Sequence, residues 1–234
     1  MIDVRPVGAL GAMREDWLDS RFHFSFAGYR DDARMGHGAL RVWNDDRIRA
    51  QSGFGMHPHR DMEIVTYVRT GAITHEDSLG NRGRTEAGDV QVMSAGTGIR
   101  HAEYNEEDED TTLFQIWILP DAAGHAPRWA ARRFPGREED GRLVPLASGR
   151  AEHEGTDALP IHQDAALYGA RLRAGDSLRH AVGPGRRVYL VAADGAITVN
   201  GIPAGARDGV AVEGEDEIVI RATEAAEIVL VDVP

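Results

Sequence analysis

The chain has 234 residues, of which 42% are hydrophobic and 27% charged, and this is the composition of a globular protein with one large or two small domains. Its net charge of −12 disfavours direct binding to nucleic acid, because an acidic surface repels phosphate groups. The absence of cysteine excludes disulfides, thiolate catalysis and a cysteine-ligated metal cluster.

The N-terminal segment, MIDVRPVGALGAMRED, lacks the basic start and continuous apolar stretch of a secretory signal. No apolar run approaches the roughly 20 residues that a helix needs to span a bilayer. We therefore expect a cytoplasmic protein that makes no membrane contact.

Short segments of alternating hydrophobicity, separated by turn residues, run through the chain and predict the strands of an antiparallel sandwich or barrel. Helical periodicity is scarce, and we expect only a turn or two of helix over residues 12–20 and another over residues 128–133. The predicted strands, in chain order, are FHFSF (22–26), EIVTYV (63–68), DVQVM (89–93), LFQIWIL (113–119), RVYLV (187–191), AITV (196–199), EIVI (217–220) and EIVLV (227–231).

A stretch rich in charge, glycine and proline over residues 134–160 predicts a boundary between two halves, with RLVPLAS (142–148) as a short strand inside it. The tetrapeptide Gly-Ala-Ile-Thr occurs at 71–74 and again at 195–198, each time after an aromatic-containing strand. This repetition favours duplication of one barrel. At the same offset, the second half has no histidine where the first half has His57 and His59.

Two histidine-bearing motifs carry the chemistry. Residues i and i+2 of a strand point to the same face, so His57 projects with His59, and His101 projects with Glu103. If the two pairs converge inside a barrel, three imidazoles and a carboxylate can hold one divalent metal ion and leave two positions for substrate and dioxygen. Pro58 removes a backbone donor between the first two histidines, which fits an edge or bulged strand.

The segments around these motifs resemble the pirin family of the cupin superfamily, and within it the bacterial branch described as quercetin 2,3-dioxygenases. The resemblance is continuous over residues 1–130 and thinner afterwards, where it rests on VYLVAADGAITVNG (188–201). The segments that carry it are HFSFAGYRD (23–31), GFGMHPHRDMEIVTYVRTG (53–71), HEDSLGN (75–81), MSAGTGIRHAEYN (93–105) and FQIWILP (114–120).

The resemblance implies an all-β bicupin, with two antiparallel β-barrel (jelly-roll) domains and few short helices. Residues 1–134 would form the metal-binding cupin domain, and residues 135–234 a cupin-like domain without metal ligands. The implied metal ligands are His57, His59, His101 and Glu103. Fe(II) is the first choice for the metal, and Mn, Co, Ni, Cu and Zn are also admissible. General cupins often use a glutamate soon after the first histidine pair, so Glu63 is an alternative ligand or a hydrogen-bond partner of a ligand histidine.

The implied activity is that of a quercetin 2,3-dioxygenase-like oxidoreductase acting on a flavonol and dioxygen. The flavonol would bind the metal through its 3-hydroxyl, with Glu103 as the catalytic base that removes the hydroxyl proton, and ring cleavage would release carbon monoxide. One alternative is a metal-binding redox sensor or transcriptional co-regulator that acts through a protein partner. Another is a cupin enzyme of a different type, such as an isomerase. We expect a monomer, because the two halves can cover each other's sheets.

Several further residues have two possible interpretations. Val65 and Tyr67 share strand parity with the ligand histidines and line the cavity or the core. Either the face of Phe114, Ile116 and Ile118 or the opposite face, with Gln115, Trp117 and Leu119, borders the pocket. His75 is interpreted as structural or exposed, and His125, His153, His162 and His180 lack a partner at ligand spacing, with His162 and Asp164 as a weak metal candidate. The acidic run EEDED (106–110) is expected to be a solvated loop, with weak cation binding as the alternative.

Overall fold

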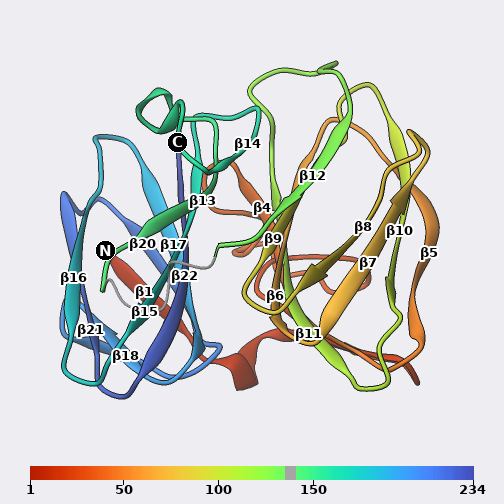
Figure 1. Ribbon diagram of the computed structural model, residues 1–234. Helices are drawn as coiled ribbons and strands as arrows, with labels where there is room; N and C mark the ends of the chain where they lie inside the picture. Colours follow the sequence, from red (N-terminus) through yellow and green to blue (C-terminus); the bar gives the residue numbers. More distant parts are fainter. Residues whose placement is uncertain (135–140) are drawn as a thin grey trace.

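A computed structural model describes residues 1–134 and 141–234 of the chain (Figure 1). Residues 135–140, where the boundary between the halves is expected to begin, lie outside the described residues. Two short 3-10 helices, η1 (Val7–Ala9) and η3 (Ala151–His153), accompany the strands in the described residues. The strands of the first half are β2 (Gly11–Arg14), β3 (Leu18–Phe22), β4 (Leu40–Ile48), β5 (Ser52–His59), β6 (Glu63–Thr70), β7 (Ala72–Asp77), β8 (Arg82–Glu86), β9 (Val90–Ser94), β10 (Ile99–Asn105), β11 (Thr111–Ile118) and β12 (Arg128–Arg132). The others are β1 (Ile2–Arg5), β13 (Val144–Ser148), β14 (Leu159–Pro160), β15 (Ala166–Leu172), β16 (Ser177–Ala181), β17 (Arg187–Asp194), β18 (Ile197–Val199), β19 (Ile202–Ala204), β20 (Gly209–Glu213), β21 (Glu217–Ala222) and β22 (Ala226–Val233).

The strands form two jelly-roll sandwiches, each made of a seven-stranded and a four-stranded sheet that do not close into a barrel. In the first sandwich the sheets have the orders β12-β9-β6-β11-β4-β3-β2 and β5-β10-β7-β8. In the second they have the orders β1-β20-β17-β22-β15-β13-β14 and β16-β21-β18-β19. All pairings are antiparallel except that of β13 with β14. Figure 1 shows the sandwiches side by side, with the four-stranded sheets on the outside. The prediction of an all-β, two-unit cupin fold is confirmed.

The largest apolar cluster lies between the two seven-stranded sheets rather than inside either sandwich. Trp43 of the first sandwich packs against Phe114 of the same sandwich, with ring centroids 5.3 Å apart, and against Tyr189 of the second sandwich at 5.6 Å. Burial of this much aliphatic and aromatic surface binds the sandwiches into one body. Each half therefore covers a sheet of the other, while the oligomeric state stays a prediction.

The interiors of the two sandwiches differ. The second interior is filled by aliphatic side chains from both of its sheets, including Leu190, Ile218 and Leu230. The first interior holds smaller apolar clusters around Leu113 and Ile64, with a layer of polar side chains and a cavity beside them. A ligand therefore has room in the first sandwich.

The N-terminal strand belongs to the second sandwich. β1 pairs with β20 from Ile2↔Val212 to Arg5↔Gly209, and the chain then crosses through η1 to begin the first sandwich. Figure 1 shows both ends of the chain in the same unit. The second sandwich is therefore built from both ends of the sequence.

Both helix predictions are wrong. Residues 12–20 lie in β2 and β3, joined by a tight turn in which Glu15 and Leu18 exchange backbone hydrogen bonds, and residues 128–132 form the edge strand β12 against β9. Short segments with mixed propensity take the conformation of the sheet edge that they complete. The predicted strand 22–26 also ends at Phe22, because the chain then turns into the cluster between the sandwiches.

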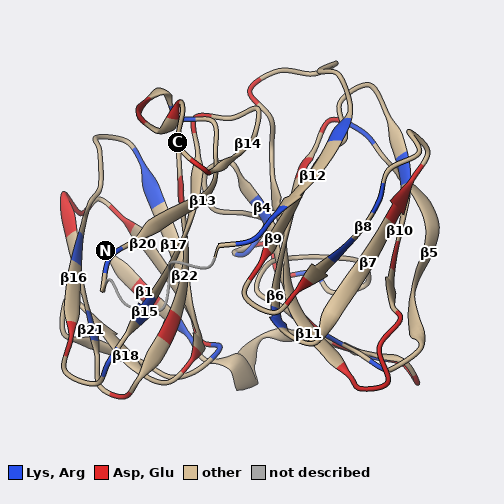
Figure 2. Ribbon diagram, in the orientation of Figure 1, with Lys and Arg blue, Asp and Glu red and all other residues tan. Residues whose placement is uncertain are grey.

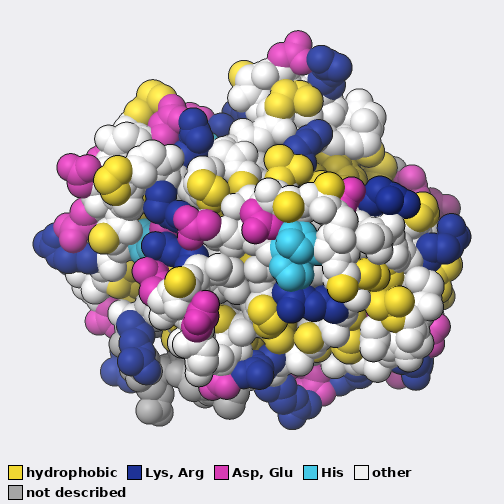
Figure 3. All heavy atoms as spheres, turned by 90° about the horizontal axis from the view of Figure 1, so that it is seen from above, with side chains coloured by type: hydrophobic (Ala, Val, Ile, Leu, Met, Phe, Trp, Pro, Cys, Tyr) yellow, Lys and Arg dark blue, Asp and Glu magenta, His cyan; other side chains and the backbone are white. Residues whose placement is uncertain are grey.

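Acidic and basic side chains are mixed along the strands of both sandwiches (Figure 2) and over the face seen from above (Figure 3). Within the acidic run at 106–110, Glu106 pairs with Arg82 and Glu107 with Arg84, so arginines already neutralise part of this loop. No helix among the described residues is both long and apolar enough to cross a membrane. The expectation that the protein does not bind nucleic acid directly stays a prediction.

Candidate metal centre

The first histidine motif lies on β5, the edge strand of the four-stranded sheet, and the second lies on its neighbour β10. His57 and His101 are direct cross-strand partners. The edge position accommodates Pro58, as the sequence predicts, because one side of an edge strand needs no ladder donor. A Cβ at Gly53 would lie 2.3 Å from the carbonyl oxygen of Glu103, so only glycine allows β5 to approach β10 this closely.

Three histidines converge on one point. The ligand nitrogens of His57, His59 and His101 all lie within 4.8 Å of one another, and the described residues hold no other group of three or more potential ligands this close. The Nε2 atoms of His57 and His101 are 3.1 Å apart. Two nitrogens bound at right angles to a metal at about 2.1 Å would be about 3.0 Å apart. The spacing therefore fits two adjacent ligands of one ion.

The protonation of the histidines also suits a metal. Burial, together with the neighbouring histidines, lowers the pKa of His59 to about 4 and the pKa of His101 to about 3. Neutral imidazole, the form that binds metals, is therefore stable at these positions at neutral pH. Nδ1 of His57 lies 2.7 Å from the carbonyl oxygen of Gly55 and donates to it, which leaves the Nε2 lone pair of His57 for an ion.

Glu103 shares the cavity but lies outside the three-histidine group. Its carboxylate is buried and accepts hydrogen bonds from Gln91 Nε2 at 2.7 Å and Gln115 Nε2 at 2.6 Å. The hydroxyl of Thr66 lies 3.0 Å from the same oxygen that Gln91 contacts. Because a carboxylate offers about four acceptor sites, these donors leave at least one for an ion or a substrate hydroxyl.

The histidines open onto a cavity of about 390 Å³, within the range of small-molecule sites. Its polar lining includes Glu103 and Gln115, and most of the remaining wall is apolar. The lining residues are Met13, Trp17, Leu18, Ser20, Phe26, Asn44, Asp46, Gly53, Phe54, Gly55, His57, His59, Ile64, His101, Glu103, Gln115 and Trp117.

Glu63 does not belong to this site. Its carboxylate accepts a hydrogen bond from Ser94 Oγ at 2.7 Å, and the residue is absent from the cavity wall. The turn between β5 and β6, where Asp61 adopts a φ of 46°, breaks the strand parity that linked Glu63 to His59. The assignment of Glu63 as an alternative ligand is therefore not supported by the geometry.

The same break in parity moves Val65 and Tyr67 away from the cavity and into the cluster between the sandwiches, so the core interpretation holds for both. On β11 the face with Gln115 and Trp117 borders the cavity, whereas the opposite face with Phe114 packs between the sandwiches. Adjacent residues of β11 therefore face different regions: one borders the cavity of the first sandwich, and the next packs in the cluster between the sandwiches.

His75 is a residue of this site that the sequence interpretation missed. It is fully buried, its ring stacks on Trp129 at 4.8 Å, and its Nδ1 lies 3.4 Å from Nδ1 of His101. Its Nε2 lies 3.0 Å from Oδ2 of Asp77. The signal was present in the sequence, because His75 and Asp77 have the i, i+2 spacing of one strand face.

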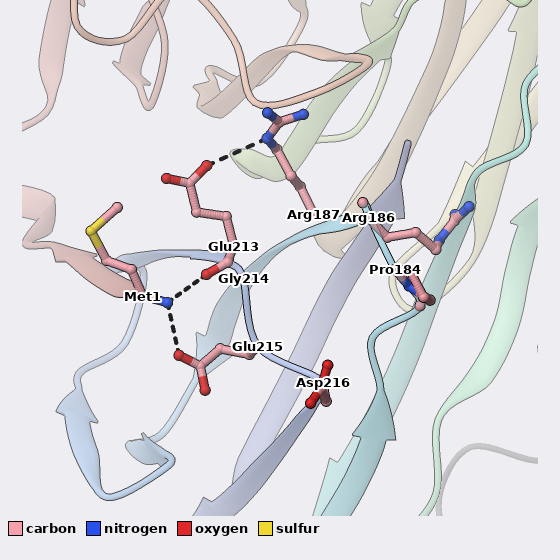
Figure 4. Close-up of a pocket in the computed structure, with 10 residues that line it drawn as sticks. Met1, Pro184, Arg186, Arg187, Glu213, Gly214, Glu215 and Asp216 are labelled. Carbon is pink, nitrogen blue, oxygen red and sulfur yellow. Dashed lines mark hydrogen bonds and ion pairs between the residues drawn. The ribbon is translucent and has the colours of Figure 1, made fainter.

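The other histidines lie outside the centre. His125 stacks on His162 with ring centroids 3.9 Å apart, and His180 pairs with Asp232 at 2.8 Å. A second cavity in the second sandwich, shown in Figure 4, has charged walls that are already paired: the amino group of Met1 contacts Glu215 at 2.7 Å, and Arg187 contacts Glu213. The cavity of the first sandwich is therefore the candidate site.

Comparisons with known proteins agree with this arrangement. Residues 4–118 match the family model described as pirin, and residues 146–233 match the quercetinase C-terminal cupin domain. The chain is 58% identical over 233 residues to a Pseudomonas aeruginosa protein, with full coverage of both. The chain belongs to the pirin family. A Caulobacter vibrioides pirin-like protein is 55% identical, with 99% of each chain covered.

The Escherichia coli member named quercetin 2,3-dioxygenase is 43% identical to this pirin, over 100% of this chain and 99% of the relative. Among solved structures, YhhW from Escherichia coli has a TM-score of 0.94 at 42% identity, covering 100% of this chain and 98% of that one. A second structure, of bacterial pirin YhhW in complex with nickel(II), has a TM-score of 0.93, with 100% and 99% covered.

Proposed function

We propose that this pirin is a metal-dependent dioxygenase that opens the ring of a flavonol such as quercetin with dioxygen and releases carbon monoxide. One observation carries the proposal: three imidazoles and a buried carboxylate line the same wall of a largely apolar cavity. A planar aromatic enol matches such a cavity, with an apolar body and one polar edge directed to the histidines. The names of the relatives point to the same substrate class.

We assign His57, His59, His101 and Glu103 as the residues that would hold the ion. When bound, a divalent transition metal supplies Lewis-acid chemistry that acidifies an enol hydroxyl and permits its reaction with dioxygen. Imidazole and carboxylate together suit Fe(II) first, and also Mn, Co, Ni, Cu and Zn. The nickel(II) complex of YhhW is a precedent in a related protein.

The chain's own residues prepare the proton transfer. Gln91 and Gln115 each donate to one oxygen of Glu103 and fix the plane of its carboxylate toward the cavity. In the proposal, Glu103 takes the proton from the substrate's 3-hydroxyl, and the apolar walls of Trp17, Phe54 and Trp117 exclude water from the reacting ring.

The decisive experiment is an aerobic assay of metal-loaded protein with quercetin, in which carbon monoxide and the loss of flavonol absorbance are measured together. We expect one molecule of carbon monoxide to be released for each molecule of flavonol that is consumed. Metal-loaded protein that binds quercetin but forms no carbon monoxide contradicts the dioxygenase. A redox-dependent pull-down of a regulator by the same inactive protein would then support the co-regulator alternative.

A further inference from the structure

A group of polar side chains lies on the cavity wall that faces the histidines. Ser20 comes from β3, and Asn44 and Asp46 come from β4, so all three belong to the seven-stranded sheet, whereas the histidines belong to the four-stranded sheet. Each of the three is at most 4% exposed. We call these three residues the distal cluster. Its members are too deeply buried to be an ordinary solvated surface.

Two polar atoms of residues that line the cavity lack a partner among the described residues: one in Asn44 of the distal cluster, and one in Trp117, whose ring packs against His59. Oδ1 of Asn44 and Nε1 of Trp117 are buried, and neither atom makes a hydrogen bond. Both residues line the cavity. Buried polar atoms in folded proteins are nearly always paired, so the unpaired acceptor of Asn44, a residue of the cavity wall, points to a partner that the described residues do not supply.

Asp46 adds a third group that can bond a hydroxyl. Its Oδ1 accepts a hydrogen bond from Ser20 Oγ, while Arg69 and Arg207 pair with the preceding residue, Asp45, on the opposite face of the strand. Burial raises the pKa of Asp46 to about 7, and the neighbouring carboxylates of Asp45 and Glu103 reinforce this. Near neutral pH the carboxyl therefore both donates and accepts, which matches the two-way hydrogen bonding of a hydroxyl group.

The cavity wall also includes the apolar side chains of Trp17, Phe54 and Ile64. Gln115, the cross-strand partner of Asn44, connects the distal cluster to Glu103. A flat aromatic ligand held by the histidines at one edge can lie against this wall and reach the distal cluster with another part of the molecule. The cavity therefore offers polar groups from both sheets together with apolar surface.

We propose that the distal cluster is a specificity site, which hydrogen-bonds a hydroxyl group of the substrate other than the one at the metal-binding edge. This inference rests on the proposed function and narrows its substrate class to polyhydroxylated aromatic enols. Asn44 and Asp46 contact this second hydroxyl, and Ser20 orients Asp46.

The test compares two flavonols that share the 3-hydroxyl and 4-carbonyl edge. Quercetin carries hydroxyls on its other rings, and 3-hydroxyflavone carries none. Affinities are measured without oxygen on nickel-loaded protein, so that no turnover occurs. We expect Asp46→Leu and Asn44→Leu each to weaken quercetin binding up to about tenfold, the effect of one lost hydrogen bond, and to leave 3-hydroxyflavone binding within about twofold.

Two further variants define the effect. Asp46→Asn keeps a donor and an acceptor and is expected to retain most of the preference for quercetin. Arg47→Gln changes the next residue of the same strand, which is exposed and pairs with Asp110, and is expected to leave both affinities unchanged. Nickel stoichiometry is measured first in every variant, and if Asp46→Leu fails to bind nickel, Asn44→Leu decides alone.

The outcomes separate this inference from the proposed function. If both flavonols bind and the ratio of their affinities is the same in wild type and in the leucine variants, the specificity site is refuted and the dioxygenase proposal stands. If neither flavonol binds the nickel-loaded wild type, the proposed function fails and the specificity site fails with it.

Discussion

His75 and His101 face each other through their Nδ1 atoms, 3.4 Å apart, inside the first sandwich. A neutral imidazole has one ring hydrogen, so the contact is satisfied if His101 donates to His75 and His75 donates through Nε2 to Asp77. Asp77 is fixed in turn by the backbone N–H groups of Leu79 and Asn81. This order of donors leaves the Nε2 lone pair of His101 directed toward the other histidines.

Substitution His75→Phe is expected to lower the affinity for nickel(II) by about 10–100-fold, because the ring orientation and tautomer of His101 lose their support. Phenylalanine keeps the stacking on Trp129, so the loss reports the hydrogen bond rather than the packing. Competition with a chelator measures the affinity. His125→Phe, at a histidine outside the cavity, is the matched control, and equal affinities in His75→Phe and wild type would refute the role of His75.

Metal binding is expected to stabilise the fold through the three histidines. At a free metal concentration of 100 times the dissociation constant, the free energy of unfolding of the wild type should rise by about 2.7 kcal/mol. His101→Ala should show no comparable rise, whereas His162→Ala should behave like the wild type. Urea unfolding with and without nickel(II) measures the difference, and full metal stabilisation in His101→Ala would contradict the assignment.

Glu103→Gln tests the proposed base. The amide keeps the size of the side chain but cannot take a proton, so carbon monoxide production should fall by about 10²–10⁴-fold. Metal content is measured in the same preparation, so that loss of the ion is not mistaken for loss of the base. Wild-type activity in this variant with metal bound would end the assignment of Glu103 as the base.

Asp46 should make stability depend on pH. Because its pKa in the folded protein is raised to about 7 from the ordinary 3.8, the folded state holds a proton that the unfolded state releases. Stability is therefore lost as pH rises from about 4 to about 7 and is level above that, at a cost of up to about 4 kcal/mol. In urea unfolding of the metal-free proteins, the free energy of unfolding of Asp46→Asn should not decline over this pH range. If it declines in parallel with that of the wild type, the raised pKa of Asp46 is refuted.

Substitutions on the face of β11 that points away from the cavity should change the stability of the fold and not the affinity for nickel. Ile116→Ala removes aliphatic volume from the cluster between the sandwiches and should lower the free energy of unfolding by about 2–5 kcal/mol. Its nickel affinity should match the wild type, because the side chain points away from the cavity. A weakened nickel affinity with unchanged stability would contradict the assignment of the two faces.

The sequence predicts most of the strands it names and the pairing of histidine side chains on strand faces, because both depend on local spacing. Two residues on one strand face stay together whatever the strand pairs with, so the shared faces of His57 with His59 and of His101 with Glu103 follow from spacing, while their role as ligands stays a proposal. Strand parity does not carry across the turn between β5 and β6. Parity with His57 and His59 therefore could not show that Val65 and Tyr67 face away from the cavity. Which face of β11 met the cavity also depended on how the sheets stack.

The other errors have a similar origin. Residues 12–20 and 128–133 have no strong preference for one conformation, and the sheet edges that they complete are formed by distant parts of the chain. The contact between His75 and His101 depends on the pairing of β7 with β10, which juxtaposes His101 with Asp77 and Glu103 with His75. The spacing of His75 and Asp77 places both on one strand face, but it does not specify the register of β7 against β10.

The placement of β1 has a consequence for how the protein is made. During synthesis β1 leaves the ribosome about 200 residues before its partner strand, β20, is completed. β1 must therefore wait, unpaired, until β20 has emerged. A chain that stopped after the first sandwich would hold this strand without its sheet and leave an apolar face uncovered, so a stable product requires both sandwiches.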